Sequence, residues 1–118
     1  MKKLLAAAVM SMGLVSLTHA AAMPKGDATA GEAKAAACAA CHGAGGVSMV
    51  PVNPTLAGQG AKYIYKQLQD FKSGRRGNPI MMGMAMPLAD QDMADLAAYF
   101  SAQQAVVGKA KPELVKLG

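Results

Sequence analysis

The chain has 118 residues, of which 53% are hydrophobic, and a formal net charge of +5 at pH 7. This length is that of one domain, and it is small for burying a large apolar core. The positive charges form no dense run of Lys and Arg, so the composition does not suggest nucleic-acid binding.

Residues 1–22 have the pattern of a secretory signal peptide. Two lysines precede the apolar stretch 4–17, which is shorter than the ~20 residues needed to span a bilayer. Small residues predict cleavage after Ala20 or Ala22. We therefore expect an exported, periplasmic protein with no stable membrane insertion after cleavage. An uncleaved membrane anchor is the alternative.

The first predicted helix spans residues 27–40. It is rich in alanine, and Asp27 has the residue type and position of an N-cap. Gly31 lowers the helix propensity in the middle of this segment. Glycine at such a position commonly permits close contact between two helices.

The pentapeptide Cys38-Ala39-Ala40-Cys41-His42 follows, and C-x-x-C-H is the attachment signature of c-type haem. The two thiols can add to the two vinyl groups of one porphyrin, and the next residue can reach the iron. We therefore expect one covalent haem c, with Cys38 and Cys41 as thioethers and His42 as an iron ligand. The haem would also serve as the central apolar mass of this small domain.

Three other interpretations of the cysteine pair are open. A disulfide between cysteines three residues apart would close a tiny loop and constrain little of the unfolded chain. A thioredoxin-like redox pair usually lies beside a βαβ pattern, but this chain has no strand-like alternation. A structural zinc site needs four ligands, whereas the chain has two Cys and two His, and His19 lies in the predicted signal peptide.

Glycine and proline predict a loop over residues 42–58. The second predicted helix spans 61–73, with apolar residues at the i, i+4 and i+7 positions 64, 68 and 71. Gly74 ends it. Glycines and prolines again predict a loop over 75–87.

The third predicted helix spans residues 90–104. Met93, Leu96 and Phe100 form its apolar stripe, and three aspartates favour its positive N-terminal end. A Lys-rich tail follows over 108–118, with a short helix expected after Pro112.

A haem that only transfers electrons takes two strong axial ligands, and a methionine thioether raises the reduction potential. Since His19 would be removed with the signal peptide, methionine is the expected second ligand. Four methionines crowd into residues 81–86, immediately before the third helix. Any of them could instead fill gaps in the core, so the pattern alone leaves the ligand open.

Four parts of the sequence together carry a family resemblance: CAACHG at 38–43, PTLAGQ at 54–59, YIYKQLQDF at 63–71, and PLADQD at 87–92 leading into LAAYF at 96–100. They resemble class I c-type cytochromes, especially the single-haem cytochrome c553 group and one domain of di-haem cytochrome c4. The resemblance implies a small all-α fold with three main helices and glycine-rich loops wrapped around one haem. The cytochrome c domain would span 23–107.

The resemblance also implies a choice of methionine. The family's ligand stands seven residues before the leucine of its L-S-D-Q-D stretch and eighteen before the tyrosine of A-A-Y-F. Leu88 and Tyr99 here both lead to Met81, with Met84 and then Met82 as the next candidates.

Two further positions are compared with the family. The proline of P-x-L-A-G-Q corresponds to Pro54, whose carbonyl would accept the Nδ1 proton of His42 and fix the ring. The family usually has Ser or Thr as the cap of the last helix, but this chain has Ala89. Either Asp90 takes over as the cap, which would shift the helix start by one residue, or the missing cap costs ~1 kcal/mol of stability.

The predicted function is that of a soluble periplasmic single-haem cytochrome, not an enzyme, which carries single electrons between respiratory or dehydrogenase partners. Alternatives are a haem subunit of a larger periplasmic redox complex, or a protein that binds a gas or peroxide at an open iron.

We expect a monomer. Its redox partners would dock through a cationic rim on the second helix and the turn after it, unless these side chains are only a solvated helix face. The rim consists of Lys62, Lys66, Lys72, Arg75 and Arg76.

Overall fold

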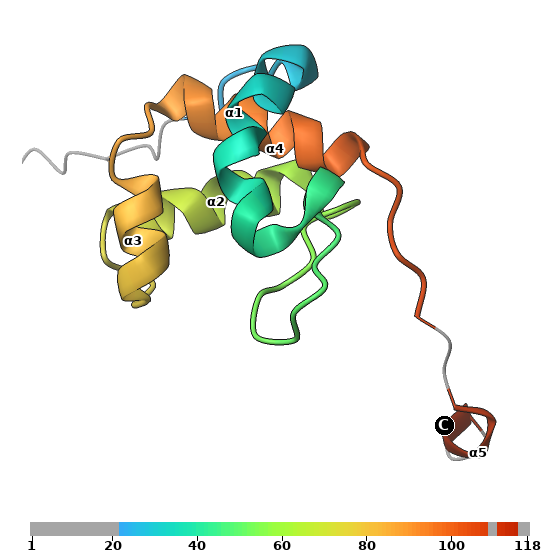
Figure 1. Ribbon diagram of the computed structural model, residues 1–118. Coiled ribbons are helices and arrows are strands. Elements are labelled where there is room, and N and C mark those ends of the chain that lie inside the picture. Colours follow the sequence, from blue (N-terminus) through green and yellow to red (C-terminus); the bar gives the residue numbers. More distant parts are fainter. Residues whose placement is uncertain (1–21, 109–110, 116–118) are drawn as a thin grey trace, which may run out of the picture.

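The computed structural model describes residues 22–108 and 111–115, and all regular structure in these ranges is helical (Figure 1). The elements are α1 (Ala28–His42), the short 3-10 helix η1 (Ala44–Gly46), α2 (Ala61–Lys72), α3 (Pro79–Ala85), α4 (Asp90–Ala102) and α5 (Pro112–Val115). The predicted all-α class and its three main helices are therefore confirmed. Except for Ala22, the predicted signal peptide lies outside the described residues. No helix in the described ranges is long and apolar enough to cross a membrane.

Helix α4 is the centre of the domain, because it packs against both α1 and α2, while α3 packs against α2 (Figure 1). The predicted stripe Met93, Leu96 and Phe100 is buried in the core. Ile64 and Tyr65 of α2 pack in the same cluster. The amphipathic patterns of α2 and α4 thus face each other, as burial of apolar surface requires.

Small residues allow α1 and α4 to cross at very short distance. A Cβ atom placed on Gly31 would lie 2.1 Å from the backbone oxygen of Asp95. One placed on Gly26 would lie 2.2 Å from the backbone oxygen of Ala94. Ala94 and Ala97 are fully buried on the facing helix. The expectation that Gly31 permits a close helix contact is confirmed.

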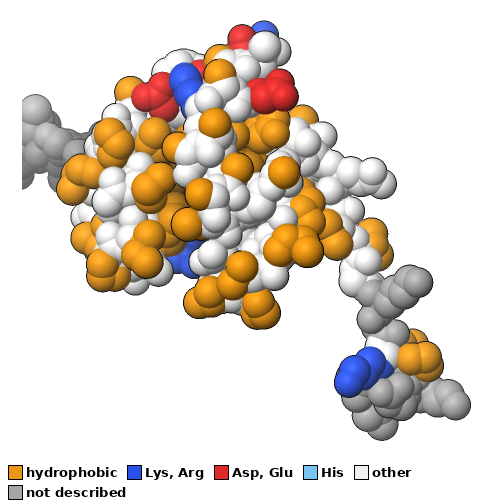
Figure 2. All heavy atoms as spheres, in the orientation of Figure 1, with side chains coloured by type: hydrophobic (Ala, Val, Ile, Leu, Met, Phe, Trp, Pro, Cys, Tyr) orange, Lys and Arg blue, Asp and Glu red, His pale blue; other side chains and the backbone are white. Residues whose placement is uncertain are grey.

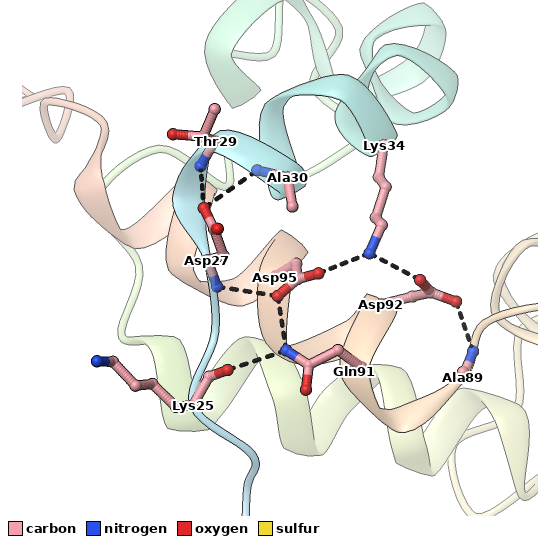
Figure 3. A network of polar contacts seen from close by, with 9 residues as sticks. All are labelled: Lys25, Asp27, Thr29, Ala30, Lys34, Ala89, Gln91, Asp92 and Asp95. Atoms are coloured by element: carbon pink, nitrogen blue, oxygen red, sulfur yellow. Dashed lines mark hydrogen bonds and ion pairs between the residues drawn. The ribbon is translucent and has the colours of Figure 1, made fainter.

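Polar contacts fix the first turn of α1 onto α4 (Figure 3). The Asp27 carboxylate caps α1, accepting hydrogen bonds from the backbone N–H groups of Thr29 at 2.8 Å and Ala30 at 3.2 Å. The backbone N–H of Asp27 donates to Asp95 Oδ1 at 2.9 Å. Gln91 Nε2 donates to the same oxygen at 2.8 Å and to the carbonyl oxygen of Lys25 at 2.9 Å. Asp27 therefore caps its own helix and also ties it to α4.

Lys34 completes this network (Figure 3). Its ammonium lies 2.6 Å from Asp95 Oδ2 and 2.8 Å from Asp92 Oδ1. Asp95 is only 3% exposed, so its charge depends on these partners. The hydrogen bond from Lys34, with those from Asp27 and Gln91, lowers the pKa of Asp95 to about 2.

The start of α4 differs from the expectation. Ala89, not Asp90, occupies the N-cap position, so the predicted shift of one residue is wrong. The Asp92 carboxylate accepts a hydrogen bond from the Ala89 N–H at 2.9 Å. This is the return half of a capping box, and it stabilises the helix start although alanine has no capping oxygen of its own.

The segment 75–87, predicted to be a loop, contains the helix α3. Asn78 is its N-cap and accepts a hydrogen bond from the Met81 N–H at 3.0 Å. Pro79 occupies the first helical position, where its fixed φ fits and its missing N–H costs nothing. Glycines and prolines therefore delimit a short helix here, where the prediction had none.

The ion network at the crossing of α1 and α4 gives the first prediction. We expect Asp95→Ala to lower the free energy of unfolding by about 2–3 kcal/mol, because it removes a buried charge pair and leaves the Asp27 N–H without an acceptor. The matched control is Asp90→Ala, which removes an exposed carboxylate from the same helix. Urea unfolding of the two variants measures the difference, and equal losses would contradict the assignment.

The same residue predicts a pH dependence. Its folded pKa of about 2 lies below the ordinary aspartate value of ~3.9, so its contribution to stability is present above pH ~4 and is lost as the pH falls toward 2. The difference in unfolding free energy between the natural protein and Asp95→Ala should therefore shrink over this interval. A difference that stays constant from pH 5 to pH 2 would exclude this role.

Candidate haem site

The two cysteines and the histidine of the C-x-x-C-H motif lie in the last turn and a half of α1. Cys38 is half-buried and packs against the core, Cys41 is exposed, and both are free thiols. Because they are three residues apart on a helix, their side chains lie on neighbouring parts of one face. Burial and the nearby Cys41 raise the pKa of the Cys38 thiol.

His42, the last residue of α1, is 7% exposed. Its ring Nδ1 lies 2.7 Å from the backbone oxygen of Pro54. Since a carbonyl can only accept a hydrogen bond, Nδ1 carries the proton and donates it. The other ring nitrogen, Nε2, then has the free lone pair that a metal ion requires.

Tight turns bring Pro54 back to the end of α1. Gly43 has φ 79° and ψ 163°, a conformation that is essentially restricted to glycine. A Cβ atom there would lie 1.9 Å from the backbone oxygen of Val47. The carbonyl of Gly46 accepts hydrogen bonds from Leu56 N at 2.7 Å and Ala57 N at 3.1 Å, which closes the loop.

The methionine candidates all lie on α3, which contacts α2. Met81 and Met82 are half-buried, whereas Met84 is 41% exposed. The terminal methyl group of Met82 lies 3.9 Å from where a Cβ of Gly74 would stand, at the end of α2. Met81 and Met84 are three residues apart and share a helix face, while Met82 projects about 100° away from Met81. Met81 and Met84 therefore face one side of α3, and Met82 faces another.

The surroundings of these residues fit a large apolar group. No charged residue occurs between Lys34 and Lys62 or between Arg76 and Asp90, the two segments that hold every candidate ligand. Both segments leave hydrophobic side chains exposed, and Figure 2 shows them gathered over α3 and over the loop beside it. The exposed members are Val47, Met49, Val50, Val52, Ile80, Met84 and Met86.

Two thiols, one buried imidazole with a fixed proton, and apolar surroundings are the donor set and environment that a covalent porphyrin needs. Among residues 22–108 and 111–115, no three side chains of His, Cys, Asp or Glu gather in a group that could hold a metal ion.

The predicted cationic rim is largely engaged with its own chain. Lys66 and Arg75 both pair with Asp70, with Arg75 Nε 2.8 Å from its Oδ1. Their hydrogen bonds, that of Lys66 first, lower the pKa of Asp70. Lys72 donates to the carbonyl of Leu88. Lys62 is exposed.

Arg76, the last cation of the rim, is also held by its own chain. It donates to Gln67 Oε1 at 2.8 Å, and its guanidinium lies 4.6 Å from the centre of the Phe71 ring.

Sequence reasoning missed two residues at the site. Asn53 donates from its side-chain Nδ2 to the carbonyl of Cys41 at 2.9 Å, a contact between loop and helix that no local pattern indicates. Asn78 caps the helix that carries the methionines. The dipeptide Asn78-Pro79 is itself a helix-start signal, an N-cap residue followed by proline, and could have revealed α3.

Comparison with known proteins gives a consistent result. The family model "Cytochrome c" matches residues 28–104. Cytochrome c4 of Pseudomonas aeruginosa is 52% identical over 118 residues, which are 100% of this chain and 57% of that protein. Cytochrome c-554(548) of Halomonas halodenitrificans is 45% identical over 82 residues, 67% of this chain and 99% of that protein.

A solved structure agrees with the sequence relatives. The reduced recombinant cytochrome c4 of Pseudomonas stutzeri superposes with a TM-score of 0.71 at 51% identity, covering 77% of this chain and 53% of that chain. The chain thus spans little more than half of both cytochromes c4. The resemblance to class I c-type cytochromes is confirmed.

The turn after His42 gives the second prediction. We expect Gly43→Ala to lower the free energy of unfolding by about 2 kcal/mol or more, because alanine cannot adopt this backbone conformation without strain and its Cβ would collide with Val47. Gly77→Ala is the control, since no atom lies within 4 Å of its Cβ position. Denaturant titration separates the two variants, and similar midpoints would refute the prediction.

Proposed function

Because this chain belongs to the cytochrome c family, whose members transfer electrons, we propose that it is a single-haem electron carrier of the periplasm. The observation that supports this most directly is the arrangement at the end of α1. There His42, fixed through Nδ1 by Pro54, ends the same helix that presents the thiols of Cys38 and Cys41. One such motif in the chain corresponds to one haem.

The residues of the site have separate roles in this proposal. Cys38 and Cys41 would form the two thioether bonds, and His42 would offer Nε2 to the iron. Pro54 holds the proton on Nδ1, which fixes the ring and raises its basicity. When bound, the haem supplies an iron that alternates between Fe2+ and Fe3+.

Met81 is the proposed second iron ligand, with Met84 and then Met82 as the next candidates. The family spacing selects Met81. The side chain of Asn78, the N-cap of α3, accepts a hydrogen bond from the Met81 N–H and so fixes the Met81 backbone in the first turn. If His42 and a methionine both hold the iron, a substrate would have no place to bind it, so we propose a carrier and not an enzyme.

Export follows from the signal-peptide pattern of residues 1–22, with cleavage after Ala20 or Ala22. We propose a mature cytochrome c domain over 23–107, followed by the tail 108–118. That cytochrome c-554(548) is matched over 99% of its length by part of this chain supports a domain of this size, and we propose that it is a monomer.

Docking of redox partners is proposed to use the positive charge of the cationic rim, above all Lys62, which is exposed. A lysine or arginine in an ion pair keeps its charge, but Asp70 offsets part of the charge of its two partners. The electrostatic attraction of this face for acidic partners is therefore weaker than it would be if all five cations were unpaired.

A second candidate is a haem subunit of a larger periplasmic redox complex. It is supported by the similarity to the thiosulfate dehydrogenase (TsdBA) of Marichromatium purpuratum, of which this chain covers 21% with a TM-score of 0.65 and 36% identity. Size-exclusion chromatography and co-purification of the native periplasmic protein distinguish the two. Elution alone at the size of one domain would support the carrier.

Covalent haem attachment is the third prediction and the direct test of the proposed function. The intact mass of the exported protein should equal the processed polypeptide plus one haem. The double variant Cys38→Ala/Cys41→Ala should lose this added mass, because no thioether can form. A mass of the bare chain, or of the chain less two hydrogens, in the natural protein would refute the proposal.

The methionine ligand gives the fourth prediction. Met81→Ala should lower the reduction potential, abolish the near-infrared thioether-to-iron band, and let carbon monoxide bind the reduced protein, because it opens one axial position. Met86→Ala is the control, since Met86 is 59% exposed on the same segment and is not a proposed ligand.

Neighbouring methionines could replace the lost ligand, so Met84→Ala and the double variant Met81→Ala/Met84→Ala complete the series. A band that is kept in Met81→Ala and lost in Met84→Ala would assign the ligand to Met84.

A further inference from the structure

The loop that follows the C-x-x-C-H motif contacts it through two adjacent residues. Asn53 Nδ2 donates to the carbonyl oxygen of Cys41 at 2.9 Å. Its neighbour Pro54 offers the carbonyl oxygen that lies 2.7 Å from His42 Nδ1. Two consecutive loop residues therefore hold two consecutive helix residues, each by one hydrogen bond.

The first of these bonds has a clear physical reason. Cys41 is the penultimate residue of α1, and the last four carbonyl groups of a helix have no partner within it. The amide of Asn53 satisfies one of them. In doing so it attaches residue 53 to the end of α1 independently of the His42 ring.

The Asn53 bond also limits where the Pro54 carbonyl can lie. A residue before proline is restricted to extended conformations, so the backbone between the Asn53 side chain and the Pro54 carbonyl has little freedom. The Asn53 N–H donates to Val50 O at 3.0 Å, which fixes the residue from the other side. Asn53 is thus held from two sides, directly before the proline whose carbonyl accepts the hydrogen bond of the His42 ring.

We propose that Asn53 is a positioning residue for the axial histidine: its bond to the Cys41 carbonyl keeps the Pro54 carbonyl on His42 Nδ1 and thereby sets the donor strength of the imidazole. The inference rests on the proposed function for His42 as an iron ligand. A strong hydrogen bond to Nδ1–H makes the ring a better donor and favours Fe3+. Loss of the Asn53 anchor weakens that bond and shifts the balance toward Fe2+.

The test uses the exported, haem-loaded protein and the variant Asn53→Leu, which keeps a similar volume and neutral charge but has no N–H donor. Two quantities are measured: the reduction potential, and the solvent exchange of the His42 Nδ1 proton in the reduced protein by NMR. We expect a higher potential and an exchange roughly five to ten times faster, the factor that corresponds to losing one ordinary hydrogen bond.

Thr55→Val is the matched control. Thr55 Oγ1 accepts a hydrogen bond from Ser48 N at 3.1 Å within the same loop, and the Thr55 side chain forms no hydrogen bond with Cys41 or His42. This variant should weaken the loop to a similar degree and leave both the potential and the exchange rate at the natural values.

Each outcome decides the proposal. Natural values in Asn53→Leu, or equal shifts in Thr55→Val, would overturn it, since the effect would then be absent or due to loop stability. Asn53→Ala serves as a second variant. Failure of both Asn53 variants to yield haem-loaded protein while Thr55→Val does so would assign Asn53 to folding alone. If the natural protein has the mass of the bare chain, it is the proposed function that fails.

Discussion

The structure depends on the close crossing of α1 and α4 at Gly31. There the backbone of Asp95 occupies the space that any side chain at position 31 would need. The side chain of Asp95 lies between Lys34 and the backbone of Asp27. The point where α1 and α4 come closest is therefore also the point where polar contacts join them. Close packing and a satisfied buried charge reinforce each other here, because the charge is stable only while the partners of both helices stay in place.

This crossing determines where the site can form. With its first turn tied to α4, α1 carries Cys38, Cys41 and His42 in its last turn and a half, at the opposite end of the helix from the Asp27 cap. The ionic contacts of Asp95 gather at the N-terminal part of α1, whereas the segments with the candidate ligands contain no charged residue. The fold thus separates a polar part that holds the helices together from an apolar part suited to a porphyrin.

Features set by local chemistry were predicted from the sequence. Asp27 as a cap, Gly31 at a crossing and the stripe of α4 each follow from a residue type at a fixed spacing. The prediction failed at α3, because Pro79 and Gly83 were interpreted as helix breakers although Asn78 makes proline acceptable at the first helical position. The start of α4 was not predicted either, because the side chain that bonds the N-cap residue Ala89 is that of Asp92, three residues further along the chain. The contact of Asn53 with Cys41 joins residues twelve apart through a folded loop, and no periodic pattern indicates such a contact.

The two proposed iron ligands are held by different parts of the fold. His42 belongs to α1 and is fixed by the loop through Pro54, whereas Met81 belongs to α3, which packs on α2. Helix α3 has its own anchors, the Asn78 cap at its start and the bond from Lys72 to the carbonyl of Leu88 just after its end. In the part of the chain that the structure describes, no hydrogen bond or ion pair joins α1 to α3. The histidine side and the methionine side are therefore anchored separately, and we expect substitutions on α3 to change the surroundings of Met81 while the contact of His42 with Pro54 is kept.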